Sequence, residues 1–214
     1  MFITFEGPDG AGKTTQIALL AERLNAAGWK TVTTREPGGT PIGCLIRGLL
    51  LDSEHAVSAT TEAYLMTADR AEHVRHVIQP ALLSKAVVIS DRYLDSTLAY
   101  QGGGRGLPVE ELRSLQTLAT GGLEPTLTLL LDLPVEEGLE RRFQDHAGNR
   151  LDRESMEFHR RVAATFHALA HADPDRWRIV DATQAIEMVH TAVWSHVVTH
   201  LESSRAALAR DVNE

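Results

Sequence analysis

Cysteine is nearly absent from this 214-residue chain, whose single thiol is Cys44, so an intramolecular disulfide is excluded. We interpret Cys44 as a small buried apolar residue of a protein kept in a reducing compartment. Basic residues are in the minority, with 21 lysines and arginines against 29 acidic residues and a net charge of −8. Because this balance disfavours non-specific binding to nucleic acid, we expect no nucleic-acid partner.

Long apolar runs are missing as well. No stretch approaches the ~20 consecutive apolar residues of a membrane-spanning helix. The N-terminus runs straight into an apolar strand pattern, without the charged and then apolar leader of a secreted chain. We therefore expect a soluble, cytoplasmic protein with no membrane partner. A hydrophobic content of 43% over this length suits one globular domain, residues 1–214.

The clearest motif is the segment Gly7–Thr14, which fits the phosphate-binding pattern G-x-x-x-x-G-K-[ST]. The apolar run Phe2–Phe5 precedes it as a buried strand, and apolar residues at helical spacing follow it as far as Gly28. The glycines allow successive backbone N–H groups to point at phosphate oxygens. Lys13 supplies a full charge to the phosphates, and the Thr14 hydroxyl is a Mg²⁺ ligand. The motif predicts a nucleoside triphosphate site.

Short apolar runs alternate with helical patterns along the rest of the chain. We predict strands over residues 2–5, 30–34, 86–90, 127–131 and 177–180. We predict helices after the phosphate loop, over 41–51, over 59–83 with an interruption at Pro80, from Pro108, over 135–171 with a break at 146–149, and at the C-terminus. The glycine-rich residues 102–106 are expected to form a loop.

This alternation predicts an α/β fold with one five-stranded parallel sheet flanked by helices. Ligands of such folds bind at the carboxyl ends of the strands. Gly7, Asp91 and Asp132 each follow an apolar strand, so we expect them to converge on one crevice.

The residues around Asp91 indicate which kind of phosphate-loop protein this is. Asp91 closes an apolar strand and can serve a bound Mg²⁺, but Arg92 follows it where motor ATPases usually need a glutamate. No Asn-Lys-x-Asp segment for guanine recognition is present. Loop arginines are abundant instead, and their planar guanidinium groups suit the clamping of a phosphoryl group in transfer. They are Arg35, Arg47, Arg70, Arg92, Arg105, Arg141, Arg142, Arg150 and Arg153. The pattern favours phosphoryl transfer to a small acceptor.

The chain resembles one family over almost its whole length, roughly residues 2–201. The segments that carry the resemblance are residues 5–15, 34–40 with Arg-Glu-Pro-Gly-Gly-Thr, 91–106 with Asp-Arg-Tyr and Ala-Tyr-Gln-Gly, 149–154 and 181–184. The family is thymidylate kinase, which transfers the γ-phosphate of ATP to dTMP. The resemblance implies the P-loop nucleoside monophosphate kinase fold with a lid, ATP and Mg²⁺, synthesis of dTDP for dTTP and DNA precursors, and a homodimer.

The resemblance also implies an ATP side of the site. The residues that would hold the phosphates are Gly7, Pro8, Asp9, Gly10, Ala11, Gly12, Lys13, Thr14 and Thr15. Thr14 and Asp91 would serve as metal ligands. Gln184 would border the adenine, and Arg142 would contact the nucleotide from the lid.

The acceptor phosphate and sugar have implied contacts too. Asp9 would lie between the two nucleotides and accept a hydrogen bond from the 3′-OH of the acceptor sugar. A carboxylate among phosphates is otherwise repulsive, which favours this role. Arg47 and Arg92 would hold the dTMP phosphate, with Arg92 reaching the transferred group, and Glu36 and Pro37 would shape the floor.

Base recognition is implied at five further positions. Arg70 would donate to thymine O4, and Thr97 and Gln101 would reach the N3 edge. Tyr100 would crowd the sugar C2′ and disfavour a ribose. Met66 stands where many relatives place an aromatic residue, and its polarizable sulfur can cover the base.

A lid is predicted over residues 141–153. Members of the family carry a catalytic cation in the phosphate loop or in the lid, and positions 8–11 here contain none. Arg141, Arg142, Arg150 and Arg153 flank the helix break, so the chain resembles the lid-arginine class. We expect Arg150 and Arg153 to join Lys13, Asp9 and Arg92 as catalytic residues.

Two other functions remain open from the sequence. One is a kinase of another nucleoside monophosphate or of a deoxynucleoside, for which Arg70, Thr97 and Gln101 would present the wrong edge contacts. The other is a regulatory module that binds ATP without transferring a phosphoryl group. The many acceptor-side arginines argue against such a module, because a switch has no acceptor phosphate to clamp.

Overall fold

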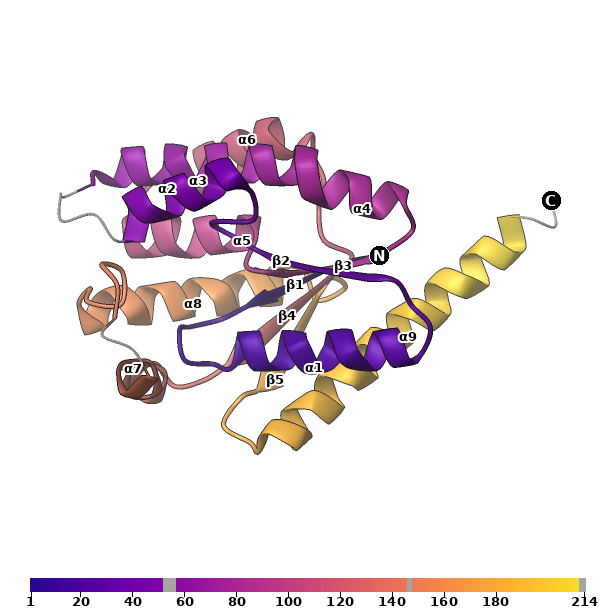
Figure 1. Cartoon of the computed structure of the whole chain (residues 1–214). Coiled ribbons are helices and arrows are strands. Elements are labelled where there is room, and N and C mark those ends of the chain that lie inside the picture. Colours follow the sequence, from indigo (N-terminus) through magenta and orange to yellow (C-terminus); the bar gives the residue numbers. More distant parts are fainter. Residues whose placement is uncertain (52–56, 146–147, 212–214) are drawn as a thin grey trace.

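A computed structural model describes residues 1–51, 57–145 and 148–211 and is organised around one parallel sheet (Figure 1). The strands of this sheet run in the spatial order β2-β3-β1-β4-β5, and every neighbouring pair is parallel. Their bounds are β1 Phe2–Glu6, β2 Thr31–Arg35, β3 Val87–Asp91, β4 Leu127–Asp132 and β5 Trp177–Asp181. The predicted α/β fold with a five-stranded parallel sheet is confirmed.

Helical segments connect the strands. They are α1 Lys13–Ala26, α2 Pro41–Leu51, α3 Ala59–His73, η1 Val74–Ile78, α4 Gln79–Leu83, α5 Leu94–Thr97, η2 Leu98–Gly104, α6 Val109–Thr120, α7 Val135–Asp145, α8 Met156–Ala172 and α9 Ile186–Asp211. The two η segments are π-helical. Within the described residues, no helix is both long and apolar enough to cross a membrane.

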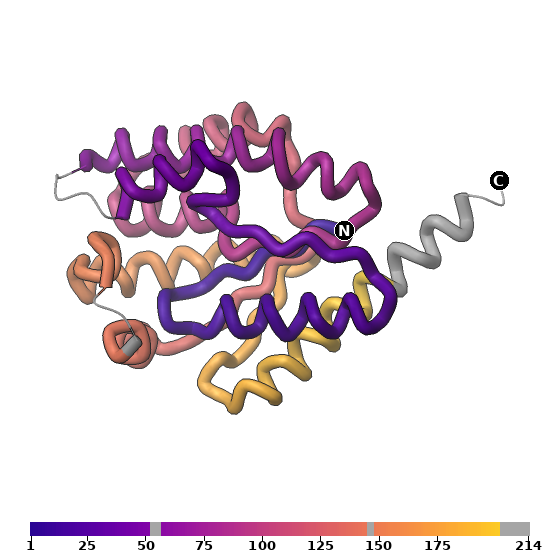
Figure 2. The backbone as a smooth tube through the Cα atoms, in the orientation of Figure 1, coloured from indigo at the N-terminus to yellow at the C-terminus, as the bar shows by residue number. Residues whose placement is uncertain are grey.

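The helices form a layer on each side of the sheet (Figures 1 and 2). Side chains of successive strand residues point to opposite faces. Phe2 therefore packs with α3, α6 and α8 on one face, while Ile3 packs with α1 and α9 on the other. Because both faces are covered, the inner strands β1, β3 and β4 are buried almost throughout, whereas the edge strand β2 is partly exposed and mostly polar. The carboxyl edge of the sheet is left for polar groups.

Two helical predictions need correction. The helical stretch from Ala59 to Leu83 is continuous, and its departure from α-helical geometry is the π-helical η1, which comes before Pro80 in the first turn of α4. The glycines Gly102–Gly104 form the end of η2 rather than a loop. They let α8 pack closely, since a Cβ on Gly103 would meet Thr165 and one on Gly104 would meet the ring of Phe158.

Two residue-level predictions are wrong. Cys44 is exposed rather than buried, because the inward face of α2 carries Gly43, Ile46 and Leu50, and Cys44 lies off that stripe. Asp132 follows its strand but does not join the crevice. It lies 3.0 Å from His167 Nε2 instead. Two of the four residues of the predicted helix break, 146–147, lie outside the described residues, and between α7 and α8 the described chain from Gly148 to Ser155 is non-helical.

Candidate active site

The phosphate loop wraps around the side chain of Lys13. It contains Gly7, Gly10 and Gly12, whose φ angles of 126°, 81° and 83° are unfavourable for residues with a Cβ. A Cβ on Gly7 or Gly10 would also collide with the backbone carbonyl of a neighbouring segment. The Lys13 ammonium donates to the carbonyls of Gly7 (3.1 Å) and Pro8 (2.7 Å), and burial lowers the pKa of Lys13 to about 8. The ammonium is thus held inside the loop where a phosphate would lie.

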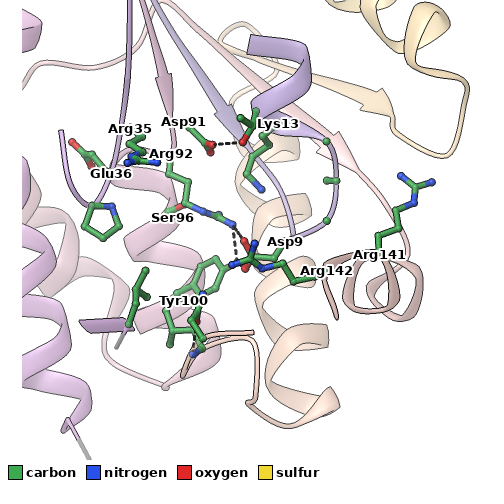
Figure 3. A pocket seen from close by; sticks show the side chains of 18 of the residues that line it. Asp9, Lys13, Arg35, Glu36, Asp91, Arg92, Ser96, Tyr100, Arg141 and Arg142 are labelled. Atoms are coloured by element: carbon green, nitrogen blue, oxygen red, sulfur yellow. Dashed lines mark hydrogen bonds and ion pairs between the residues drawn. The ribbon is translucent and has the colours of Figure 1, made fainter. Parts of the chain in front are cut away.

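A cavity of about 910 Å³ opens beside this loop at the carboxyl edge of the sheet (Figure 3). This volume is at the upper end of the range for ligand pockets and suits an extended ligand or two adjacent ones. Most of the predicted site residues line it, namely 9–15, Glu36, Pro37, Arg47, Met66, Asp91, Arg92, Tyr100, Gln101, Arg142 and Gln184. Gly7 and Pro8 contribute through their carbonyls. The predicted residues outside the lining are Arg70, Thr97, Arg150 and Arg153.

Asp9, Arg92 and Tyr100 meet in the middle of the cavity (Figure 3). Arg92 Nη2 donates to Asp9 Oδ1 at 2.9 Å and to the Tyr100 hydroxyl at 3.1 Å, and that hydroxyl donates to Asp9 Oδ2 at 3.0 Å. Burial alone would raise the pKa of Asp9, but the nearby charges of Arg92 and Lys13 outweigh it and hold the pKa well below its usual range. Asp9 is therefore a permanent acceptor between the two halves of the site.

Glu6 supports Arg92 from beneath. Arg92 has a positive φ of 71°, which is unusual for a residue with a long side chain. Both oxygens of the Glu6 carboxyl are engaged beside it, by the backbone N–H of Tyr93 (2.9 Å) and the hydroxyl of Ser96 (2.6 Å). Ser96 in turn accepts from Arg92 Nη1 at 3.1 Å. Sequence reasoning gave Glu6 no role, although a carboxylate ending an apolar strand was a usable signal.

Thr14 and Asp91 form the candidate cation site. The Thr14 hydroxyl donates to Asp91 Oδ2 at 3.4 Å, and both residues line the cavity. Hydroxyl and carboxylate oxygens are the hard donors that Mg²⁺ prefers. Among the described residues, no group of three or more His, Cys, Asp or Glu could hold a metal ion by itself. The arrangement thus suits a cation that is shared with the phosphates of a ligand.

The acceptor half of the cavity is lined by Glu36, Pro37, Arg47, Met66 and Gln101. Arg47 Nη1 donates to the Pro37 carbonyl at 2.9 Å, which fixes its stem along the cavity floor. Gln101 is buried, and its Nε2 donates to Glu62 at 2.7 Å. Within the described part of the chain, Gln101 Oε1 is a buried acceptor without a hydrogen-bond partner. Such an atom is costly unless a ligand or an ordered water supplies a donor.

Arg70 and Thr97 stand behind the wall of this half rather than in it. Both are fully buried, and the guanidinium of Arg70 is surrounded by partners. Its Nε donates to Glu36 at 2.8 Å, and its two terminal nitrogens donate to Thr97 Oγ1 (2.9 Å), the Tyr93 carbonyl (2.9 Å) and Gln116 Oε1. These bonds occupy the N–H groups of Arg70 that we predicted to donate to thymine O4.

The arginines of the predicted lid divide into two groups. Arg141 and Arg142 of α7 line the cavity, and Arg142 Nε donates to the buried Asp152 at 3.1 Å. Arg150 turns to the acceptor side, where it donates to the Leu50 carbonyl (2.9 Å) and to Glu62 (2.5 Å). Arg153 is exposed and donates to the Gly148 carbonyl at 3.3 Å. The two arginines predicted to be catalytic are therefore not the two that the fold brings to the cavity.

The far end of the cavity combines a polar group with apolar ones. Gln184 Nε2 donates to Asp181 at 2.9 Å, and apolar lining comes from Ala182, Ile186 and Val189. The helical spacing of Ile186 and Val189 marks only one face of the last helix. Their place at the start of α9, beside the phosphate loop, depends on the strand order and could not be read from helical spacing.

A phosphate loop that shares its cavity with a second, arginine-bearing pocket places this chain among the P-loop nucleoside monophosphate kinases. Residues 5–193 match the family model of thymidylate kinase. A thymidylate kinase of Thermomicrobium roseum is 58% identical over 205 residues, covering 95% of this chain and 97% of the relative, and one of Desulfovibrio desulfuricans is 53% identical, covering 88% and 91%. The crystal structure of thymidylate kinase from Ehrlichia chaffeensis is 35% identical with a TM-score of 0.75, covering 92% of this chain and 98% of its own. The chain belongs to the thymidylate kinase family.

Proposed function

We propose that the cavity holds ATP and dTMP end to end, with ATP on the P-loop side and dTMP against Met66 and Gln101. Family membership makes the chain an enzyme that phosphorylates dTMP to dTDP, on the route to dTTP. The observation that carries the residue assignment is Gln101 Oε1, a buried acceptor without a partner in the described structure, on a residue that lines the same cavity as the phosphate loop.

Gln101 suits thymine because of the chemistry of the base at N3. Thymine N3 carries a proton and donates, whereas cytosine N3 accepts. The Gln101 amide already uses its donor end on Glu62, which leaves its acceptor end for the base. Met66 covers the ring, and the ring of Tyr100 takes the space beside the sugar. Arg70 and Thr97, which we predicted to touch the base, support this pocket from behind through Glu36.

The donor half positions the triphosphate of ATP. Backbone N–H groups of residues 10–15 and the start of α1 surround the phosphates, and Lys13 adds its charge to them. Thr14 and Asp91 would hold Mg²⁺, which when bound neutralises phosphate charge. Ala182, Ile186 and Gln184 would border the adenine.

Phosphoryl transfer in this site needs charge and alignment more than a base. The attacking phosphate oxygen of dTMP is already anionic at pH 7, so no residue has to remove a proton from it. Arg92, Arg47 and Lys13 would hold the two nucleotides in line and offset the negative charge that gathers between them. Asp9 would fix Arg92 and accept from the acceptor sugar. Arg141 and Arg142 would add lid charge on the ATP side, and Arg150 and Arg153 remain proposed lid contributors.

A homodimer in the cytoplasm is the proposed state of the enzyme. The support is a stripe of exposed apolar residues on the outer layer, formed by Ile42, Leu45 and Leu49 of α2 and Tyr64 of α3. Leu45 is 72% exposed, and Ile42, Leu45 and Leu49 recur at the spacing of one helix face, which is typical of a surface that packs against a partner. The support for a cytoplasmic location is the lone Cys44, a free and exposed thiol, which suits a compartment that keeps thiols reduced.

The direct test is ADP release with Mg²⁺·ATP against dTMP, dUMP, dCMP, dGMP, dAMP and thymidine. A strong preference for dTMP is expected. Activity with a different monophosphate would retain the phosphoryl chemistry and overturn Gln101 and Met66 as the base pocket. Absence of acceptor-dependent release would instead identify a regulatory module that binds ATP.

A further inference from the structure

Glu62 of α3 is a fully buried carboxylate that lines the cavity and bonds both Gln101 and Arg150. Its Oε1 accepts from Gln101 Nε2 at 2.7 Å, and its Oε2 accepts from Arg150 Nη2 at 2.5 Å. Arg105 approaches both oxygens at 3.3 Å. A buried carboxylate beside Arg105 and Arg150 offsets their positive charges. The hydrogen bond to Gln101 gives Glu62 a second role.

We propose that Glu62 is a specificity-determining residue, because it fixes the side-chain amide of Gln101 in the orientation that reads the N3–H of thymine. This inference rests on the proposed function, in which Gln101 is the base reader. Glu62 acts through Gln101 and is therefore a positioning residue.

The two ends of the Gln101 amide differ chemically, whereas the two oxygens of the Glu62 carboxylate are alike. A glutamine amide donates through its nitrogen and accepts through its oxygen, whereas an ionised carboxylate only accepts. If the Gln101 amide turned over, its oxygen would lie opposite Glu62 Oε1, leaving two buried acceptors with no proton between them. Leaving a buried polar group unpaired in this way disfavours the reversed orientation by about tenfold or more.

The surroundings of Glu62 keep it an acceptor. Burial alone would raise the pKa of Glu62, but the hydrogen bonds from Arg150, Gln101 and Arg105 outweigh it and lower the pKa below its usual value. A carboxyl that took up a proton could donate to Gln101 and release the amide. The two arginines therefore maintain the orientation of Gln101 without touching it.

The fixed amide orientation selects bases by whether their N3 atom donates or accepts a hydrogen bond. With Oε1 directed away from Glu62, Gln101 can accept from the N3–H of thymine or uracil, whereas cytosine would set its own N3 acceptor against the Gln101 oxygen. Sites built to hydrogen-bond one partner reject the mismatched one strongly, because the buried polar groups are left unpaired. This selectivity requires both Glu62 and Gln101, because an unrestrained Gln101 amide could turn over and bond either base.

The test compares kcat/KM for dTMP with kcat/KM for dCMP in Glu62→Gln and in the wild type. Glutamine at position 62 can donate or accept, so the Gln101 amide is freed, and we expect the dTMP:dCMP ratio to fall about tenfold or more. The matched control is Glu154→Gln, because Glu154 also pairs with Arg105 (2.6 Å) but does not touch Gln101. The control should keep the wild-type ratio. In a Gln101→Leu background, Glu62→Gln should change the ratio no further.

The possible results distinguish a failure of the Glu62 role from a failure of Gln101 as the base reader. A ratio that is unchanged in Glu62→Gln, or lower catalysis with both nucleotides equally, would overturn the role of Glu62 and leave the proposed function standing. A wild type that does not distinguish dTMP from dCMP would overturn Gln101 as the base reader and the inference with it. If Glu62→Gln does not fold, Glu62→Asp keeps the charge for Arg105 and Arg150 but withdraws it from Gln101, and the same fall is expected.

Discussion

Arg92 and Asp9, 83 residues apart in the chain, form an ion pair of 2.9 Å between the two halves of the cavity. The pair joins the end of β3 to the phosphate loop, so the acceptor and donor halves share one electrostatic centre. Each partner stabilises the charged form of the other in a partly buried place, where an isolated charge would be costly. The geometry of this centre motivates the first two predictions.

Lys13→Ala should abolish turnover while the fold remains intact. The ammonium is the cation held inside the phosphate loop, and loss of one preorganised charge at a transferring group costs about 100-fold or more in kcat. ADP release and circular dichroism would be measured together. The control is Lys30→Ala, because Lys30 is exposed and its ammonium donates to Ser84 Oγ, away from the cavity. Near-wild-type turnover in Lys13→Ala would remove the P-loop from the mechanism.

Tyr100→Phe should lower kcat/KM for dTMP by about tenfold, since it removes the hydroxyl that bonds Asp9 and Arg92. The preference for a deoxyribose should survive, because the ring that crowds C2′ is kept. Rates with dTMP and with its ribose counterpart would be compared. Tyr93→Phe is the control, since its hydroxyl bonds the Leu123 carbonyl away from the cavity. Loss of sugar discrimination in Tyr100→Phe would show that the hydroxyl, not the ring, selects the sugar.

Arg142→Ala should reduce kcat about 100-fold and leave KM for dTMP within about threefold, because Arg142 lines the cavity and is proposed to contact ATP rather than dTMP. Arg153→Ala should have a smaller effect, since Arg153 is exposed and outside the lining. Steady-state kinetics with each nucleotide varied would separate the two parameters. Joint removal of Arg150 and Arg153 should also lower kcat more than dTMP affinity, and a fall in dTMP affinity alone would contradict their lid role.

Glu6→Gln should flatten the dependence of stability on pH between 6 and 8. Burial raises the pKa of Glu6 from 4.5 to about 8, so the folded chain keeps a proton that the unfolded chain has lost. Stability conferred by this group is present below pH ~4.5 and falls as pH rises toward 8, by up to about 1.4 kcal/mol per pH unit. Asp69, with a pKa raised to about 6, contributes only at the lower end. Urea unfolding at pH 6, 7 and 8 would measure the slope, and equal slopes in both proteins would mean that Glu6 is ionised when folded.

Leu45→Asp should convert a dimer into a monomer, because it places a charge in the centre of the exposed apolar stripe of α2. Sedimentation equilibrium would give the mass. Met188→Asp is the control, since Met188 is 61% exposed on α9, in the layer on the opposite face of the sheet (Figure 1). A wild type that sediments as a monomer would end the dimer proposal.

Local sequence patterns were enough to predict the strands and helices of this fold and the phosphate loop. Apolar strand runs, helix-start signals and the glycines at positive φ are read within a few residues of the chain, and the predicted helix over 41–51 matches α2 residue for residue. The predictions that failed depend on packing between distant segments. Gly103 and Gly104 could not be recognised as contacts for α8, nor Cys44 as lying off the inward face of α2.

The sequence by itself determined the fold class, the family and the set of charged residues available to the site. Tertiary structure alone decided which of those charges face the cavity and which face one another. Arg70 and Arg142 are alike as residue types, yet one is enclosed by Glu36, Thr97 and Gln116 while the other lines the cavity. The reason is physical: a guanidinium is directed by the acceptors that surround it, and those acceptors come from strands and helices far apart in the chain.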